Sequence, residues 1–485
     1  MNQQLTNNYE LTARVEELKK ILPSEDILNY EFVSLTGKRF GLIYADGIVD
    51  KNMIGELVIK PLSVTRGDLT AEEVKKLLAS PDVKDGKNLE DAVEKITGGD
   101  AVLLIDGEED FYVIGVKSPP GRAVAEPPTE VVIKGPREGF TEDIKVNLGL
   151  VRKRIKNENL IIKTVTVGEQ SKTTVAICYI DGICKEGLPE KIEEDIMEKK
   201  IDIIPDSSYI AGFITKRPRS LFKRNASCEK PDIFCAKICE GRVGIITDGS
   251  PIALTIPYML TEDFQSSEDY YAVSYRSTTL RVLRVIAVIF GILLPAVYVC
   301  AQLFKIQLIP PKLLFKIASS VAGIPLSPSV EILLTLFVLE VLNEASIRMP
   351  KYVGLALSVV GALVLGDTAV KAGIISTPAV IIIAFSAICL YTVPDFVETS
   401  TTLRLMVLII AGSVGTFGVL LCAAFIICYL VTEQDYGVPV LAPYAPLIAG
   451  DMRDTMYKAN TQSLKKRPRV LKLKNQVRFK EDNEG

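Results

Sequence analysis

The sequence of 485 residues contains no histidine and no tryptophan. Without histidine, Ser-His-Asp and Cys-His catalysis are excluded, as are His-ligated zinc and haem sites. The nine cysteines are irregularly spaced and odd in number, which argues against a disulfide framework. Cys235 and Cys239, with Cys228 nearby, come closest to a metal site. No fourth paired cysteine lies close, so we expect buried thiols and no metal or cofactor.

Charge is also missing from one long stretch. The whole chain carries 56 basic and 59 acidic residues, but only 13 of the 146 residues between Val285 and Leu430 are charged. This pattern predicts an α-helical transmembrane domain, residues 285–430, with a soluble region of about 280 residues before it. Met1 to Leu22 includes acidic residues and repeats its apolar residues with a helical period, so it predicts an amphipathic helix within 1–24 and no cleavable signal.

The soluble region repeats a local pattern in which an apolar or aromatic run ends in Asp-Gly, a turn signal after a strand. The four pairs begin at Asp46, Asp106, Asp181 and Asp248. Helical patterns lie between them, at 71–78, 89–96, 144–155 and 188–199. We interpret this as two α/β subdomains of similar plan, 25–118 and 140–258, joined by a Pro-rich linker at 119–139. Four unrelated hairpins are the alternative.

Span assignment follows from uncharged length, since about 20 helical residues cross the hydrocarbon core. Val285–Phe304, Ala372–Pro394 and Leu405–Leu430 qualify as single spans. Tyr352–Val370 qualifies as a fourth if Asp367 lies at its end. Glu331, Glu340 and Glu344 interrupt Val330–Pro350, leaving eight uncharged residues, so this segment is expected to be a re-entrant or interfacial helix.

Basic residues beside the spans set the orientation. Arg276, Arg281 and Arg284 precede the first span, after a juxtamembrane segment at 259–284. The tail at 431–485 holds ten basic residues against Asp454 alone between Arg453 and Lys480. Both termini are therefore expected in the cytoplasm, with four crossings. Lys465-Lys466-Arg467 indicates either anionic membrane lipids or a plain topology signal, and no nucleic acid.

Gly135-Pro136-Arg137-Glu138-Gly139 lacks the Gly-Lys-Ser/Thr ending of a phosphate-binding loop. Followed by Phe140 and by Asn147-Leu148-x-Leu150-x-Arg152-x-Arg154, it resembles the signature of the GerA family, the A subunits of bacterial spore germinant receptors. Further blocks resemble that family in the same order. They are Glu240-Gly241-Arg242-Val243, Asp248-Gly249-Ser250-Pro251, 264–271, 359–366, 436–443 and Lys466-Arg467-Pro468.

The resemblance implies a non-enzymatic component of the spore inner membrane that acts with a permease-like B subunit and a lipoprotein C subunit in nutrient sensing. It also implies a homo-oligomer around a central cation channel as a hypothesis. A receptor-like paralogue of the same family is the alternative role. One departure is Leu336, where A subunits typically carry an acidic residue in line with Glu340 and Glu344.

Two features suit a pore or close helix packing. Gly354, Gly361 and Gly366 give one apolar segment a small-residue surface, which permits close helix contact. Glu340 and Glu344, four residues apart on one helical face, would attract cations in a ring. Packing within one chain and a face wetted by lipid headgroups are the respective alternatives. Besides the receptor subunit, a secondary transporter of ions or amino acids and a membrane enzyme remain open, although no inverted repeat and no catalytic constellation supports them.

Overall fold

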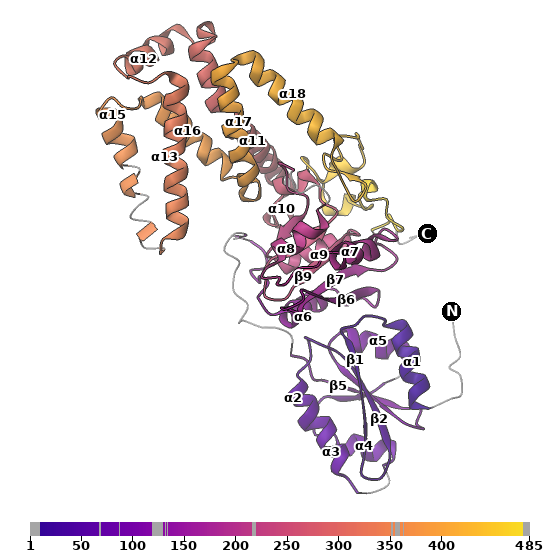
Figure 1. The fold of residues 1–485 in the computed structure, drawn as a ribbon. Coiled ribbons are helices and arrows are strands. Elements are labelled where there is room, and N and C mark those ends of the chain that lie inside the picture. The colour runs from indigo at the N-terminus through magenta and orange to yellow at the C-terminus, as the bar shows by residue number, and fades with distance from the viewer. Residues whose placement is uncertain are drawn as a thin grey trace.

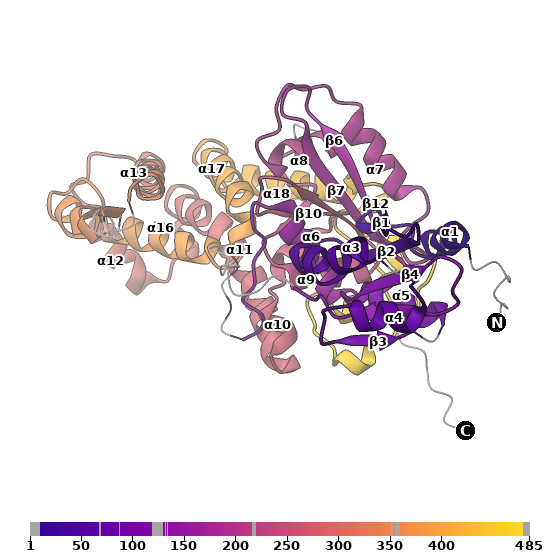
Figure 2. The ribbon, with the colours of Figure 1, turned by 90° about the horizontal axis from the view of Figure 1, so that it is seen from below.

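The computed structural model describes residues 10–478 apart from 67–68, 87, 119–129, 131, 133, 216–219, 351–352, 355–358 and 362. Two α/β subdomains follow one another, and a helical region extends from the second (Figure 1). Seen along the perpendicular direction, the helical region projects to one side of both subdomains (Figure 2). Most of the predicted linker 119–139 lies outside the described residues.

The first subdomain contains a five-stranded antiparallel sheet in the order β1-β2-β4-β5-β3. Its elements are α1 Leu11–Ile21, β1 Ile27–Val33, β2 Arg39–Ala45, α2 Lys51–Ile54, η1 Gly55–Ile59, α3 Lys60–Val64, α4 Ala71–Leu77, β3 Val83–Asp85, α5 Leu89–Thr97, β4 Ala101–Ile105 and β5 Phe111–Ile114. The central strands are buried along their whole length because helices cover both faces of the sheet.

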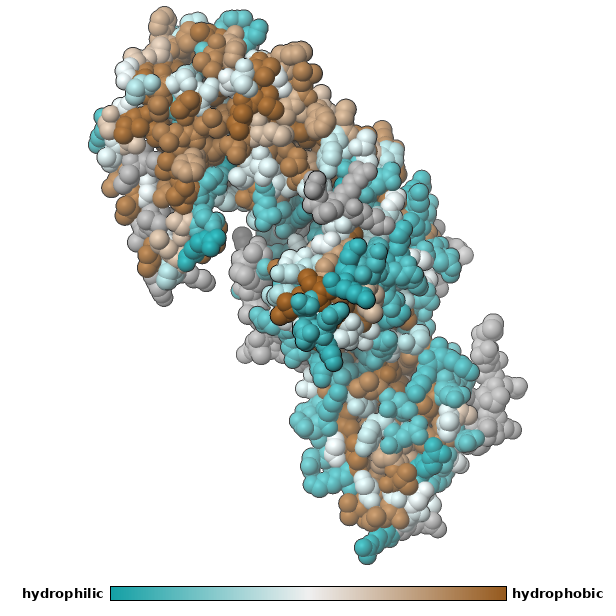
Figure 3. All heavy atoms as spheres, in the orientation of Figure 1, coloured by the Kyte–Doolittle hydropathy of each residue, from teal (hydrophilic) through white to brown (hydrophobic). Residues whose placement is uncertain are grey.

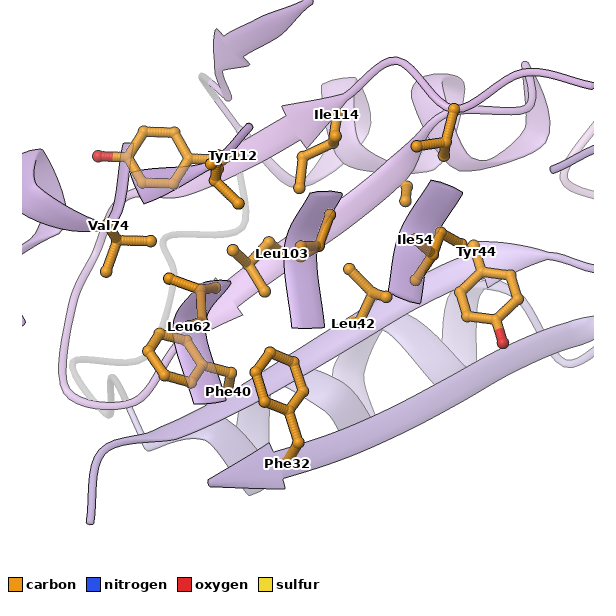
Figure 4. Close-up of a cluster of buried hydrophobic side chains, with 14 of the residues drawn as sticks. Phe32, Phe40, Leu42, Tyr44, Ile54, Leu62, Val74, Leu103, Tyr112 and Ile114 are labelled. Carbon is orange, nitrogen blue, oxygen red and sulfur yellow. The ribbon is translucent and has the colours of Figure 1, made fainter. Parts of the chain in front are cut away.

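Each face of this sheet has its own core. Ile54, Leu62 and Val74 pack against Leu42 and Leu103 on one face (Figure 4). On the other, α1 and α5 cover the sheet through the buried residues Leu11, Val15, Leu18, Val93 and Ile96. The helical period of residues 11–22 therefore reflects packing of α1 on the sheet.

The second subdomain repeats this plan with the strand order β6-β7-β9-β10-β8. Its elements are α6 Ile144–Arg154, β6 Leu160–Val167, β7 Thr173–Ile180, α7 Leu188–Met197, α8 Ser207–Ile214, β8 Ala226–Cys228, α9 Pro231–Cys239, β9 Val243–Thr247 and β10 Ala253–Ile256. Helices α6 and α9 cover one face, and α7 and α8 the other. The prediction of two α/β units of similar plan is confirmed by the matching strand orders.

The Asp-Gly pairs have two uses. Asp106-Gly107 and Asp248-Gly249 join the hairpins β4–β5 and β9–β10 as predicted. Asp46-Gly47 and Asp181-Gly182 instead lead from a strand toward a helix. In both of these the aspartate side chain accepts a hydrogen bond from the following glycine N–H, at 2.9 and 2.8 Å, so the same dipeptide stabilises a turn without closing a hairpin.

A buried ion pair fixes the two subdomains to each other. Arg152 of α6 donates to both oxygens of Asp26, at 2.8 and 2.6 Å, and both side chains are almost fully buried. The Ser24 hydroxyl accepts hydrogen bonds from the Arg152 guanidinium and from the Ile162 amide. Because this pair carries satisfied hydrogen bonds on both sides, it specifies one arrangement of the two units.

The helical region is apolar on its surface (Figure 3). Its elements are α11 Ser274–Leu303, η3 Ile306–Leu308, α12 Pro311–Val321, α13 Pro328–Arg348, η4 Val364–Thr368, α15 Ala369–Lys371, α16 Thr377–Leu390, η5 Pro394–Phe396, α17 Val397–Ser413 and α18 Thr416–Thr432. Two helical stretches, Ser274–Leu303 and Pro394–Ser413, are long and apolar enough to cross a membrane, and α16 and α18 are shorter apolar helices.

The prediction of one span at Leu405–Leu430 is wrong. The segment folds as a hairpin of α17 and α18 that reverses at Gly415, whose φ is +77°. Phe304, at the end of α11, lies against Gly415 where a Cβ would come within 3.0 Å of its ring. The turn requires a positive φ and a close approach, both of which glycine allows.

Two other predicted segments differ in extent. Within Ala372–Pro394, α16 has 14 residues and therefore spans about 21 Å. The described parts of Tyr352–Val370 are helical. Val330–Pro350 forms most of a single 21-residue helix, α13, long enough at about 30 Å to match a bilayer core. Its non-crossing assignment stays a prediction.

Both ends of the helical region lie at the second subdomain. Residues 259–273, with η2 Leu260–Phe264 and α10 Glu268–Tyr271, lead from its sheet into α11. After α18 the chain returns to it as β11 Gln434–Asp435, β12 Val438–Pro439, η6 Asp451–Arg453, η7 Thr461–Ser463 and η8 Arg469–Leu471. The described tail is thus a packed element, and its Val470, Leu471 and Leu473 are buried with Met259.

The hairpin at Gly415 predicts the labelling pattern of the α17–α18 connection. Val414 is exposed at the turn, at the end of the bundle opposite the soluble region, whereas Leu408 is buried within α17. A Val414→Cys variant should react with a membrane-impermeant maleimide added outside whole cells, and Leu408→Cys should not react above the parent protein. A continuous span through 405–430 would place residue 414 within the hydrocarbon and protect both positions.

Candidate functional site: the junction between the soluble and helical regions

The junction comprises the contacts among the second subdomain, residues 259–273, the first turns of α11 and the tail 433–478. At its centre is Asp269 of α10, which is almost fully buried. Arg281 and Arg284, on one face of α11, donate to its carboxylate at 3.1 and 2.8 Å. Arg281 also binds Asp454 of the tail at 3.1 Å. One carboxylate therefore connects the juxtamembrane segment, the first long helix and the tail.

A second buried ion cluster joins the sheet to the juxtamembrane segment. Glu262 of η2 contacts Arg242, which directly precedes β9, and lies 2.9 Å from Lys237 of α9. Burial alone would raise the pKa of Glu262, but Arg242 and Lys237 outweigh it and lower the pKa to about 2. The carboxylate is therefore ionised at any physiological pH.

The tail is held at its beginning as well as at its end. Glu433, directly after α18, forms a buried ion pair with Arg224. The Asp435 carboxylate accepts a hydrogen bond from the Tyr258 backbone N–H at 2.8 Å. The Tyr436 hydroxyl donates a hydrogen bond to the Asp195 carboxylate at 2.6 Å. These contacts fix the exit of the last helix to the same subdomain that the first helix leaves.

Several motif residues belong to the junction. Gly135, with φ +123°, lies so close to Tyr271 that a Cβ would come within 2.6 Å of the ring. Gly241, with φ +100°, is similarly close to Leu473 of the tail. Glu240 pairs with Arg478 at 2.5 Å. These family residues place the linker and the α9–β9 turn directly against the juxtamembrane segment and the tail.

Other motif residues stabilise the subdomain itself. Glu138 pairs with Lys153 and Arg154, both at 2.8 Å. The Asp248 carboxylate accepts a hydrogen bond from the first backbone N–H of α6, and the Gly249 N–H donates to the Glu142 carbonyl. The Ser250 hydroxyl donates to Asp206, the N-cap of α8. Arg137 is exposed, Gly139 is buried, and Pro136 and Pro251 lie in the adjoining loops. The block 248–251 thus organises the N-termini of α6 and α8.

The basic tail motif is engaged within the protein. Arg467 is buried and donates to the backbone carbonyls of Cys239, Asn475 and Val477. Cys228 and Cys235 are buried in the core beside α9, and burial raises the pKa of both thiols. Among the described residues, no group of three Cys, Asp or Glu side chains is placed to hold a metal ion.

The predicted pore residues lie apart from the junction. A Cβ at Gly361 would meet the Leu342 side chain at 3.0 Å, and one at Gly354 would meet the Ser346 carbonyl at 3.1 Å. Gly366 faces open space within the chain. Gly354 and Gly361 therefore contact α13 of the same chain. Leu336, the departure from the acidic stripe, is buried in the bundle core.

Glu340 and Glu344 have different partners. Glu344 pairs along the helix with the exposed Arg348 at 2.5 Å. Glu340 pairs with Arg404 of α17 at 2.5 Å, and sequence reasoning missed this partner because Arg404 directly precedes the uncharged stretch and marks only its boundary. Arg404 is buried and also donates to Ser386 of α16. An arginine at the edge of an apolar stretch and within the same predicted helix is the signal that could identify it.

Replacing Glu262 with glutamine should destabilise the junction. The Glu262→Gln variant leaves Arg242 and Lys237 buried without a carboxylate, which typically costs about 3 to 5 kcal/mol. The pKa of Glu262 is lower in the folded state than in the unfolded state. Its carboxylate therefore stabilises the folded state fully above pH 4.5, and this stabilisation is lost as the pH falls toward 2. Thermal unfolding of the detergent-solubilised full chain should therefore be less pH-dependent in that window for the variant. Glu138→Gln, which breaks a more exposed pair, is the control, and equal small shifts would contradict the expectation.

The Arg404–Glu340 pair predicts a non-additive pair of substitutions. Glu340→Gln leaves the buried Arg404 cation uncompensated, so it should lower the thermal midpoint markedly. Adding Arg404→Met removes the cation and should recover most of that loss, because the site then packs as an apolar one. Glu344→Gln is the exposed control. An additive loss in the double variant would show that the pair is not coupled.

The apolar helical region is joined at both its ends to the tandem α/β region. This arrangement defines a membrane protein whose soluble part packs directly against its helices. A model of the family described as Bacillus/Clostridium GerA spore germination protein matches residues 15–470. The chain belongs to this family, and the resemblance carried by the motif blocks is confirmed.

Similar proteins share most of the chain. Spore germination protein KA of Bacillus subtilis (strain 168) is 34% identical over 91% of this chain and 82% of its own length. Spore germination protein B1 of the same strain is 30% identical over 95% and 96%. YfkQ of that strain, an uncharacterized membrane protein, is 33% identical over 88% and 84%. The solved N-terminal domain of the A subunit of the Bacillus megaterium spore germinant receptor GerK3 aligns with a TM-score of 0.41 and 24% identity, covering 52% of this chain and 97% of the domain.

Proposed function

We propose that this chain is the A subunit of a spore germinant receptor and transmits a nutrient signal between its soluble region and its membrane helices. The observation that carries the proposal is the junction, because buried ion pairs tie the end of α18 directly to the second subdomain and tie α11 to it through the juxtamembrane segment. Relatives named as spore germination proteins align with nine-tenths of the chain or more, which supports the same role.

The proposed setting is the spore inner membrane, with both termini in the cytoplasm. The packing of the tail on the second subdomain supports this, because the soluble region and residues 433–478 then lie on one side and the number of crossings is even. We propose a permease-like B subunit and a lipoprotein C subunit as partners, and self-association of this subunit in the membrane. The exposed apolar side chains of the bundle would face lipid or neighbouring subunits.

We further propose that self-association forms a cation pathway beside α13. Glu344 and Arg348 are exposed on that helix, and Arg404 holds Glu340 against the bundle. Cation flux from liposomes containing the purified chain, with and without the B and C subunits, tests this. Flux that needs this subunit and responds to nutrient only with its partners supports the proposal. Flux from the B subunit alone would assign conduction elsewhere.

Gly361→Leu should abolish nutrient-triggered germination while the protein stays in the membrane. A Cβ added at Gly361 would lie 3.0 Å from the Leu342 side chain. A leucine there would therefore force its helical segment away from α13, at a cost of about 1 to 3 kcal/mol. A cost of this size shifts a two-state equilibrium by about tenfold or more. Germination of spores from the variant strain is the measurement, with immunoblots for this subunit and its partners.

Gly366→Leu provides the matched control, because its Cβ would meet no atom of the chain within 4 Å. It adds the same apolar bulk to the same segment without a clash, so germination should remain normal. Normal germination in Gly361→Leu would remove this contact from signalling. A loss in both variants would instead point to a neighbouring subunit that packs on the whole face.

A further inference from the structure

A cavity of about 470 Å³ lies within the junction. Its walls come from α9 and the turn after it, from residues 262–270, from Asp395 of η5, and from the tail. Its size falls in the range of about 300 to 1,000 Å³ that is usual for small-molecule sites. A ligand here would touch the second subdomain, the juxtamembrane segment and the tail, whose relative position the junction fixes, and also η5.

One part of the lining is acidic. Glu130, Asp263 and Asp395 line the cavity here together with Lys223, whose ammonium lies 2.9 Å from Asp263 and 3.8 Å from Asp395. Burial and the nearby Asp395 raise the pKa of Glu130 to about 7, and Lys237 only partly offsets them. Burial likewise raises the pKa of Asp263 to about 6. Two lysines, Lys223 and Lys237, face the three carboxyl groups of this side, and Lys237 also pairs with Glu262, which favours a further cationic group here.

Another part of the lining is basic and includes a buried donor without an acceptor. Arg242 is 2% exposed and uses its terminal nitrogen for Glu262 and the Pro257 carbonyl. Its Nε–H finds no acceptor among the described residues. Arg467 and Arg478 line the same cavity. An unsatisfied buried N–H costs about 1 to 3 kcal/mol, which an anionic oxygen bound there would offset.

We propose that this cavity binds a small zwitterion, whose ammonium group lies between Glu130 and Asp395 and whose carboxylate or phosphate accepts from Arg242. The inference goes beyond the receptor role and stands or falls independently of it. Two sources share this chemistry, a free amino acid and the headgroup of an aminophospholipid. Asp395 belongs to η5, the short helix that leads into α17, so the cavity lies where the soluble part meets the membrane helices.

Calorimetric titration of the full chain in phosphatidylcholine nanodiscs tests the proposal with β-alanine and phosphoethanolamine. At least one should bind saturably, and ethylamine and propionate, which carry one charge each, should bind at least tenfold more weakly. Glu130→Gln and Arg242→Lys should each weaken binding about tenfold. Asp395→Asn is a second, exposed variant for the acidic side. Glu138→Gln, outside the cavity, should bind as the parent does.

Two further measurements test the role of Glu130 and distinguish a free amino acid from a lipid headgroup as the natural ligand. Affinity for β-alanine should fall as pH drops below 7, since bound ammonium favours ionised Glu130, and in Glu130→Gln the fall should begin only near pH 6, where Asp263 titrates. Added phosphatidylethanolamine should compete with phosphoethanolamine only if a lipid headgroup is the natural ligand. No saturable binding of either zwitterion, ethylamine binding of equal strength, or unchanged affinity in the three lining variants would each overturn the proposal.

Discussion

The carboxylate of Asp269 is the group on which the rest of the molecule depends. It is buried, and because a buried carboxylate without cationic partners is costly, Arg281 and Arg284 of α11 must both reach it. This requirement fixes the rotation of α11 about its axis, since both arginines must face α10. Arg281 in turn binds Asp454, which positions the tail. A movement of any one of these segments disturbs charges that the other two share.

Rigid coupling continues through the soluble region. Arg152 and Asp26 join the two subdomains, Glu262 joins the second subdomain to the juxtamembrane segment, and Asp269 joins that segment to α11. The first and the last of these connections place an arginine from a helix onto a buried carboxylate from a different unit. A ligand or partner that moves the first subdomain must therefore either break the buried ion pair between the subdomains or move both subdomains together and so carry the movement toward α11. The second course is the less costly one, because an uncompensated buried charge costs several kcal/mol.

Local signals in the sequence predicted the soluble region better than the membrane region. Asp-Gly turns and helical periods identified two similar α/β units, although two of the four turns lead into helices, because a dipeptide alone does not specify the next element. Gly415 reverses the chain between apolar residues, so uncharged length alone merged α17 with α18. The motif blocks located the junction only in part. Glu240 with Arg478 and Arg224 with Glu433 are pairs more than two hundred residues apart, and such contacts leave no periodic signal.

Arg404 imposes a similar constraint inside the bundle. It binds Glu340 of α13 and Ser386 of α16, and Ser386 donates to the Gly291 carbonyl of α11, so four helices meet around one guanidinium. A charge at this depth is costly, and an apolar residue would stabilise a static bundle better. Arg404 and Glu340 can change partners only at the same time, because either charge left without its partner inside the bundle is unfavourable. Such a site favours two discrete arrangements over a continuous range, and this is the property that a membrane switch requires.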